Sequence, residues 1–313
     1  MILTITPNPA LDLTWRVDAL VPGATHRVPT GSSRAGGKGL NVARVLHNQG
    51  HDVLALATVG GPTGAEFETD LTTSGIPHRV IPVSAPTRRT VAVVDDGRRE
   101  TSILNEPGAK LGEAEVSAML EEASRLGRSA RAVTISGSLP PGFGDDHLER
   151  LVRELVTRGI PVVADTSGPA LLAAARAGAD ALKPNREELE SATGHADPLD
   201  GANALLSLGA RLVVVSLGAE GLVVVTRDRP PVRAQLPRTL HGNPTGAGDA
   251  AVAAIAVELA ERGPAASEAL EALARRAAAW SASAVLMPLA GDLSDHTAAL
   301  ADEMLVTTMK DLP

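Results

Sequence analysis

The sequence has 313 residues, a net charge of −8 at pH 7, no cysteine and no tyrosine. This length suits one large α/β domain with an appendage, and the negative charge argues against nucleic acid or an anionic membrane as a partner. The lack of cysteine excludes disulfides, thiolate metal sites and a cysteine nucleophile. No leader sequence and no membrane-length apolar run is visible, so we expect a soluble, cytoplasmic protein.

Most of the chain shows strand and helix patterns in alternation. Strands are predicted at residues 1–6, 53–59, 132–135, 161–164, 181–182, 212–216 and 222–226, and helices at 42–49, 145–158, 169–177 and in two alanine-rich segments that close the chain. Such alternation predicts a parallel sheet covered by helices on both faces. The fold class is therefore α/β.

Two segments, 11–34 and 87–105, have a different pattern. Both are rich in β-branched residues and lack helices of their own, and Asp95-Asp96-Gly97 in the second segment indicates a hairpin. We expect the two segments to pair into a small second sheet over the edge of the main one.

The most informative segment is His241-Gly-Asn-Pro-Thr-Gly-Ala-Gly-Asp249-Ala250, which leads into an apolar helix-forming stretch. A turn of small residues before a helix leaves unpaired N–H groups at the positive helix end, where an anion binds. Asp249 beside that anion is placed to take a proton from an attacking hydroxyl, which indicates phosphoryl transfer. Two alternatives stay open: Asp249 as an ordinary N-cap, and residues 246–251 as the G-x-G-x-x-A turn of a nicotinamide-dependent oxidoreductase.

Other unusual residues follow the predicted strands, where ligands collect in open α/β sheets. Asn185 and Glu188 lie on one face of a helix start, where they could hold magnesium through its waters or simply cap the helix. Arg27, Lys38 and Arg88 come from the β-rich segments and the adjacent loop. Together they could hold a phosphate, although solvation at the surface is the default for each.

The order and spacing of these motifs resemble the ribokinase-like phosphofructokinase-B sugar kinases. The resemblance rests on Asp12, Ala35-Gly-Gly-Lys38-Gly-Leu-Asn41, Thr87-Arg88, Ser136-Gly-Ser138-Leu-Pro-Pro-Gly, Lys183-Pro-Asn185-x-x-Glu188, Ser216-Leu-Gly218-x-x-Gly221 and Thr245-Gly-Ala-Gly-Asp249. Thr6-Pro-Asn-Pro-Ala-Leu-Asp12, Lys38 and Asn105-Glu-Pro-Gly108 favour the branch of 1-phosphofructokinase and tagatose-6-phosphate kinase. The resemblance covers nearly the whole chain.

This resemblance implies a ribokinase-like three-layer α/β/α sandwich with a mainly parallel sheet. Its nucleotide-binding core would comprise residues 1–10, 35–86 and 106–313. Residues 11–34 and 87–105 would form a β-sheet lid, which in the family often makes the contact of a homodimer.

The resemblance also implies a role for each matching residue. Asp249 would be the general base, and the amides of Gly246, Ala247 and Gly248 would bind the transferred phosphoryl group. The expected substrate-binding residues are Asp12, Gly37, Asn41 and Ser138, with Lys38, Arg88 and Arg27 on phosphate. The expected nucleotide-binding residues are Lys183, Asn185, Ser216, Gly218 and Gly221, and Asn185 and Glu188 would organise magnesium through water.

The expected function is ATP- and Mg²⁺-dependent phosphorylation of fructose 1-phosphate to fructose 1,6-bisphosphate. Tagatose 6-phosphate or fructose 6-phosphate is the alternative substrate, and a catalytically silent sugar-phosphate sensor is another alternative. The sequence departs from the family at Gly60-Gly-Pro-Thr-Gly64, which lacks the usual aspartate, and at Gly242-Asn-Pro-Thr245. It also has Thr90 where relatives often have asparagine. These departures leave the sugar open.

Overall fold

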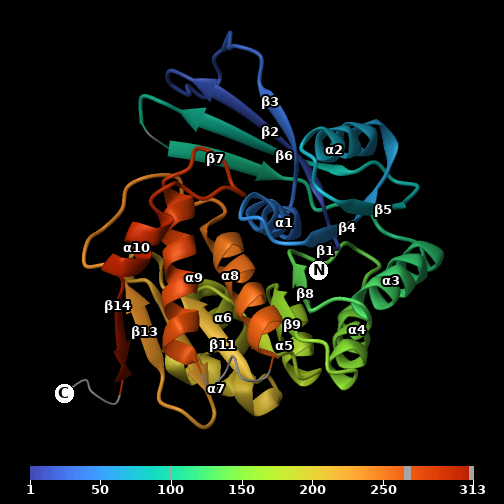
Figure 1. Ribbon diagram of the computed structural model, residues 1–313. Coiled ribbons are helices and arrows are strands. Elements are labelled where there is room, and N and C mark those ends of the chain that lie inside the picture. Colours follow the sequence, from blue (N-terminus) through green and yellow to red (C-terminus); the bar gives the residue numbers. More distant parts are fainter. Residues whose placement is uncertain (99, 264–268, 310–313) are drawn as a thin grey trace.

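Two sheets of unequal size organise the structure, a computed structural model that describes residues 1–98, 100–263 and 269–309 (Figure 1). Among these residues the large sheet has ten strands, in the order β14-β13-β12-β11-β10-β9-β8-β1-β4-β5. The strands from β11 to β5 are parallel, and β12, β13 and β14 extend the sheet in antiparallel pairs. They are β1 (Ile2–Thr6), β4 (Val53–Val59), β5 (His78–Pro82), β8 (Ala132–Ser136), β9 (Val162–Asp165), β10 (Ala181–Leu182), β11 (Leu212–Ser216), β12 (Leu222–Thr226), β13 (Val232–Gln235) and β14 (Leu305–Thr308).

Helices cover both faces of the large sheet. One face packs against α1 (Lys38–Asn48), α2 (Gly61–Thr73), α8 (Ala247–Arg262) and α9 (Leu270–Val285), and α10 (Thr297–Glu303) packs on α9. The other face packs against α3 (Glu113–Gly127), α4 (Asp145–Thr157), α5 (Pro169–Arg176), α6 (Arg186–Thr193) and α7 (Pro198–Leu208). Each face has its own buried cluster because successive strand residues point to opposite sides, as Val213 and Val214 do on β11. The result is a three-layer α/β/α sandwich.

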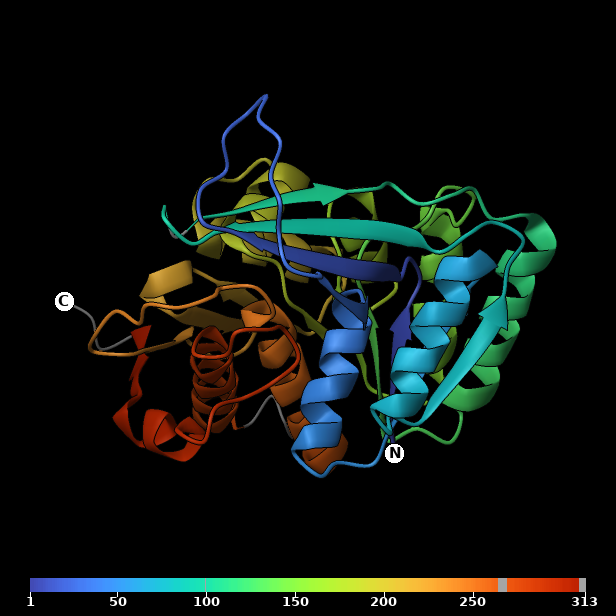
Figure 2. The same cartoon turned by 90° about the horizontal axis from the view of Figure 1, so that it is seen from above.

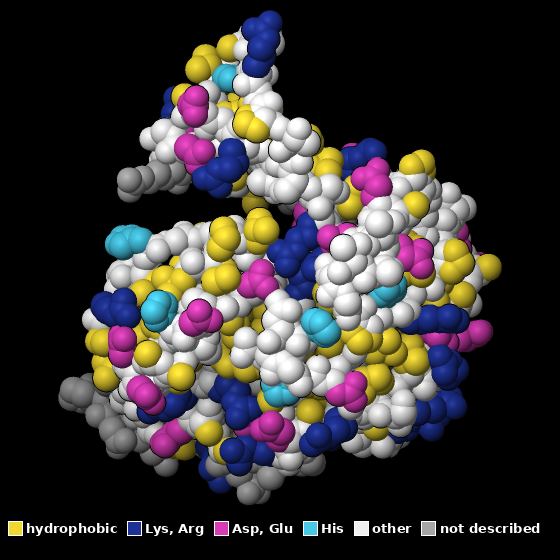
Figure 3. Space-filling view, turned by 45° about the horizontal axis from the view of Figure 1, so that its top comes forward, with side chains coloured by type: hydrophobic (Ala, Val, Ile, Leu, Met, Phe, Trp, Pro, Cys, Tyr) yellow, Lys and Arg dark blue, Asp and Glu magenta, His cyan; other side chains and the backbone are white. Residues whose placement is uncertain are grey.

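The small sheet has four strands in the order β3-β2-β6-β7. These are β2 (Ala10–Val17), β3 (Ser32–Gly36), β6 (Arg88–Asp95) and β7 (Glu100–Asn105). The sheet packs on α2 and projects above the helices and strands of the sandwich (Figures 1 and 2). In the space-filling view it overhangs a hollow that contains lysine or arginine side chains at its inner end (Figure 3).

The α/β class, the parallel core and the small second sheet expected from the sequence are confirmed, with corrected boundaries. The first helix begins at Lys38 rather than at residue 42, because Gly37 has a φ of 111° and the chain enters the helix directly after it. The alanine-rich helices α8 and α9 do not close the chain, since α10 and β14 follow them. Residue 99, within the segment predicted at 87–105, lies outside the described residues.

The dinucleotide-binding alternative for residues 246–251 is wrong. β13 ends at Gln235, and residues 236–246 form turns and irregular chain rather than a strand. A nicotinamide-binding turn requires a strand directly before it within a βαβ unit.

In the part of the chain that the structure describes, no helix has the length and apolar character needed to cross a membrane.

Candidate active site

Asp249 lies in the first turn of α8, directly after the glycine-rich turn. Gly246 precedes the helix with a φ of 87°, and only 6 % of the Asp249 surface is exposed. The Asp249 carboxylate accepts a hydrogen bond of 2.8 Å from Nδ2 of Asn41 on α1. Gly246 occupies the N-cap position, and no side chain caps this helix. The N-cap interpretation of Asp249 is therefore wrong, because its carboxylate is held by another element instead.

The backbone of the same turn presents N–H groups at the positive end of α8. The Ala247 N–H donates to Pro244 O at 3.2 Å, whereas the N–H groups of Gly246 and Gly248 have no partner among the described residues. Unpaired N–H groups at a helix N-terminus form a site for an anion. The turn can thus receive a phosphoryl group, chiefly through the Gly246 and Gly248 amides.

Two lysines and two further carboxylates gather beside Asp249. Nζ of Lys38 lies 3.1 Å from Glu188 Oε1 and 3.4 Å from Asp165 Oδ1. Nζ of Lys183 lies 3.4 Å from the same Asp165 oxygen. A Cβ atom on Gly248 would lie 3.2 Å from Lys183 Nζ, so the missing side chain of Gly248 leaves room for this ammonium group beside the helix end.

Burial and charge shift the pKa values of this cluster. Burial raises the pKa of Asp249 to about 6, and Asp165 adds to the increase against the opposing effects of Asn41, Lys38 and Lys183. Burial by itself would lower the pKa of Lys38, but Asp165 and Glu188 outweigh it and raise that pKa. At pH 7 Asp249 is therefore mostly ionised but more basic than a surface aspartate, which suits a proton acceptor.

Asp165 is a site residue that the sequence analysis missed. It ends β9, is fully buried, and its Oδ2 atom has no hydrogen-bond partner among the described residues. The available signal was an acid at the end of an apolar strand, Val162-Val-Ala-Asp165. Since parallel strands end at one edge of a sheet, such an acid lies close to other residues that follow strands, here Lys183 after β10.

On the small sheet, Asp12 lies beside Gly36 and near the cations Arg34, Arg44 and Arg88. It pairs across the strands with Arg34 and Thr90. Burial raises its pKa to about 6, against the opposing effects of the Thr90 hydrogen bond and of Arg88. A Cβ atom on Gly36 would lie 1.9 Å from Asp12 Oδ2, which explains why the chain has glycine there. Gly37 follows at the start of α1.

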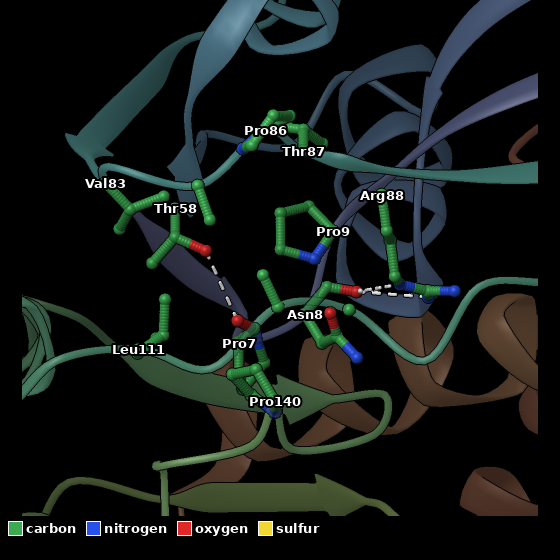
Figure 4. Close-up of a pocket in the computed structure, with 13 residues that line it drawn as sticks. Pro7, Asn8, Pro9, Thr58, Val83, Pro86, Thr87, Arg88, Leu111 and Pro140 are labelled. Atoms are coloured by element: carbon green, nitrogen blue, oxygen red, sulfur yellow. Dashed lines mark hydrogen bonds between the residues drawn. The ribbon is translucent and has the colours of Figure 1, made fainter.

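Arg88, at the start of β6, is held by backbone carbonyl groups. Its guanidinium donates to Asn8 O at 3.2 and 3.3 Å and to Glu106 O at 3.0 Å. Asn8 Nδ2 in turn donates to Ser138 Oγ at 3.0 Å. Figure 4 shows Arg88 turned toward Asn8 at the edge of a cavity of about 30 Å³. That volume suits a water molecule and not a sugar phosphate.

Arg27 is not brought to this group. It lies in the connection between β2 and β3 and is exposed. Of the three cations singled out in the sequence, Lys38 lies near Asp249 and Arg88 lies near Asp12, while Arg27 contacts neither carboxylate within the described structure.

A second group of sequence-predicted residues lies at the ends of β10 and β11. Asn185 caps α6 by accepting a hydrogen bond of 2.7 Å from the Glu188 N–H, and the Glu188 carboxylate accepts one of 2.9 Å from the Asn185 N–H. The capping interpretation is therefore confirmed. A β-bridge places Asn185 beside Ser216, and Gly218 follows with a φ of 63°. At Gly221 a Cβ atom would lie 2.1 Å from Ala234 O, so only glycine fits.

The oxygen atoms near the ends of β9 and β10 suit a magnesium ion held largely by water and substrate phosphates. Among the described residues no group of three or more histidine, aspartate or glutamate side chains is arranged to hold a metal ion. Glu188, Asn185 and the unpartnered Oδ2 of buried Asp165 nevertheless supply oxygen donors, which Mg²⁺ prefers in small numbers alongside water.

A proton acceptor beside an amide-lined anion site is typical of a phosphotransferase that acts on an alcohol. Residues 7–297 match the model of the pfkB family of carbohydrate kinases. The chain belongs to this family and is a carbohydrate kinase, and kinases of this family use ATP as the phosphoryl donor.

Similar proteins include kinases with two different sugar specificities. The chain is 39 % identical to "1-phosphofructokinase" of Xanthomonas campestris pv. campestris, with 89 % of each chain covered. It is 37 % identical to "ATP-dependent 6-phosphofructokinase isozyme 2" of Mycobacterium tuberculosis, covering 82 % of this chain and 77 % of that protein. The structure of Escherichia coli phosphofructokinase-2 in complex with potassium aligns with a TM-score of 0.88 at 30 % identity, covering 96 % of this chain and 98 % of that chain.

Proposed function

We propose that this kinase phosphorylates fructose 1-phosphate at the 6-hydroxyl, producing fructose 1,6-bisphosphate and ADP. The observation that carries the kinase step is the Asp249 carboxylate, buried beside the unpaired amides of Gly246 and Gly248. The choice of sugar is supported by the 39 % identity to a 1-phosphofructokinase. The lysine at position 38 and the Asn105-Glu-Pro-Gly108 segment, both typical of that branch, support it further.

In this mechanism Asp249 accepts the proton of the attacking hydroxyl. The new bond joins O6 of the sugar to the γ-phosphorus, and the bond from that phosphorus to the bridging oxygen of ADP breaks. The amides of the 246–248 turn stabilise charge on the transferred phosphoryl oxygens, where one such donor is worth about 3 kcal/mol. Lys183 lies beside that turn and supplies positive charge.

Each remaining group holds a substrate in place. Asp12, Gly37 and Asn41 bind sugar hydroxyls, and Asn41 also orients Asp249 through its hydrogen bond. Arg88 and Ser138, linked through Asn8, bind the sugar's existing phosphate. Lys38, between Asp165 and Glu188, binds the phosphate in transfer, and exposed Arg27 reaches a phosphate only if its segment moves.

The nucleotide binds along Lys183, Asn185, Ser216, Gly218 and Gly221, with Asn185 and Glu188 orienting Mg²⁺ through its waters. When bound, Mg²⁺ would neutralise part of the negative charge on the phosphate groups of the nucleotide. We assign residues 11–34 and 87–105 as a lid over the core formed by 1–10, 35–86 and 106–313.

The lid also supports a homodimer as the functional assembly. Every residue of β7 is exposed, and the large apolar side chains of Ile103 and Leu104 are 49 % and 61 % exposed. A long exposed edge strand with apolar side chains is a template for pairing with another chain. Sedimentation of the full chain and of the Leu104→Asp variant tests this assignment.

The decisive experiment is a panel of fructose 1-phosphate, fructose 6-phosphate and tagatose 6-phosphate, assayed with Mg-ATP for ADP release. The highest kcat/KM is expected with fructose 1-phosphate. A higher value with either 6-phosphate would replace the sugar but keep the kinase. Sugar-phosphate binding without ADP release from any of the three would instead support a silent sensor.

A further inference from the structure

Arg34 connects the lid to residues 290–292, which lie next to the glycine-rich turn before α8. It lies on β3, with a side chain that is 23 % exposed. Its Nη1 atom donates to Ala290 O at 2.9 Å, and Nη2 lies 3.7 Å from Asp292 Oδ2. Among the described residues no other lid side chain hydrogen-bonds to residues 242–309.

The segment that Arg34 holds supports Gly246 directly. A Cβ atom on Gly246 would lie 2.7 Å from Ala290 Cβ and 2.8 Å from Ala290 Cα, so the two backbones are in close contact. Asn243 Nδ2 donates to Pro288 O at 3.1 Å, and the Asn243 N–H donates to Val285 O at 2.8 Å. Residues 285–291, here called the supporting segment, therefore fix the backbone of the turn that presents the amides.

Arg34 also lies next to Asp12, which we assign to the sugar. Arg34 is the cross-strand partner of Asp12, and the positive charge of Arg34 favours the ionised form of the Asp12 carboxyl. The Arg34 side chain thus lies between Asp12, which we assign to a sugar hydroxyl, and the supporting segment, which holds the turn that presents the amides. Because Asp12 and Arg34 lie on neighbouring strands of the lid, a shift of the lid moves both relative to the supporting segment.

We propose that Arg34 is a positioning residue that couples sugar-phosphate binding under the lid to the alignment of the phosphoryl-binding amides. The inference rests on the proposed kinase function and adds a residue to it. Arg34 touches neither reactant in this scheme. It keeps the amides of the 246–248 turn aligned when the sugar holds the lid in place, so that nucleotide and sugar bind cooperatively.

The test compares Arg34→Met, which keeps the apolar stem and removes the donors, with Arg34→Lys, which keeps one charged donor. With the ketose phosphate that the wild-type enzyme prefers, Arg34→Met is expected to lower kcat about tenfold, less than the roughly hundredfold that a 1 Å misplacement of reacting groups can cost. The KM for each substrate, measured with the other saturating, should rise about fivefold, because the coupling between the two sites is lost. Arg34→Lys should recover part of the loss.

Calorimetry with a non-hydrolysable ATP analogue measures the coupling directly. In the wild type the sugar phosphate should tighten binding of the analogue, and Arg34→Met should reduce that tightening at least fivefold. Asn48→Ala is the matched control, because Asn48 donates to Asp292 from α1 without touching the lid. That variant should leave both readouts unchanged.

Four outcomes would overturn the inference. They are a kcat for Arg34→Met within twofold of wild type, an unaltered coupling factor, a wild-type coupling factor of one, or an equal loss in Asn48→Ala. If the wild-type enzyme turns over none of the ketose phosphates, the proposed function fails separately. Hydrogen exchange of unliganded protein then still tests Arg34, since Arg34→Met should speed exchange in residues 242–250 and 285–294, and unchanged exchange contradicts the proposal.

Discussion

The end of the site that we propose for phosphoryl transfer (the transfer end) and the end that we propose for the sugar phosphate (the sugar-phosphate end) lie on different parts of the molecule. At the transfer end, Asp249, Asp165 and Lys183 are buried on elements of the α/β sandwich, each at most 6 % exposed. At the other end, Arg88 and Ser138 lie on a small-sheet strand and a loop and are partly or fully exposed. The residues that we propose for phosphoryl transfer thus lie on buried core elements, and those proposed for the sugar's phosphate lie closer to the surface.

Burying a carboxylate lowers stability at both ends of the site. Burying Asp249 raises its pKa from 3.8 to about 6, so its ionised form costs stability as the pH rises through that range. At about 1.4 kcal/mol per pKa unit, the cost is about 3 kcal/mol above pH 7. At the other end Asp12 carries a comparable cost, since burial raises its pKa to about 6 as well, whereas Arg88 remains partly exposed.

The largest expected effect is at the transfer end. Asp249→Asn should lower kcat at least about a hundredfold, the low end for loss of a general base. The same change removes a buried charge, so the melting temperature at pH 8 should rise, by up to about 5 °C, rather than fall. Coupled ADP release and thermal unfolding measure the two effects. Near-full activity, or inactivity that merely accompanies unfolding, would contradict the assignment of Asp249.

A smaller effect is expected at the sugar-phosphate end. Arg88→Gln should raise the KM for the sugar phosphate about 10- to 100-fold, the worth of one hydrogen bond to a charged group, and change kcat less than threefold. Arg89→Gln is the matched control, because neighbouring strand residues point to opposite faces and Arg89 is exposed. Equal effects of both substitutions would show that the Arg88 contact is not specific.

The smallest expected effect is on the pH dependence of kcat/KM, to which one carboxylate from each end of the site contributes. Asp249 and Asp12 both have pKa values raised to about 6, so both lose their charge as the pH falls below 6. The value of log kcat/KM should therefore drop with a slope approaching two in the wild type. In Asp12→Asn the slope should be lower by one. This change distinguishes titration of the enzyme carboxylate from titration of the substrate phosphate, which has a similar pKa. An acid limb that begins below pH 5 would contradict both shifts.

Sequence reasoning worked where the signal was local or came from the order of motifs. The strands at 53–59, 212–216 and 222–226 have the predicted bounds, because apolar β-branched runs between turn residues are unambiguous. Asp249 was found because its glycine-rich turn adjoins it in the chain. Asp165 was missed because its two lysine partners lie far away in the sequence and no special spacing marks it.

By itself the sequence determined the class of fold, the family and the glycine-rich turn before α8, because periodicity, glycine placement and motif order are properties of neighbouring residues. Only the tertiary structure decided that Lys38 binds Asp165 and Glu188, that Asn41 holds Asp249, and that Arg34 reaches Ala290. These contacts depend on which strand ends and helix starts meet at one edge of the sheet. Burial and charge there also set the pKa values, which no linear pattern contains.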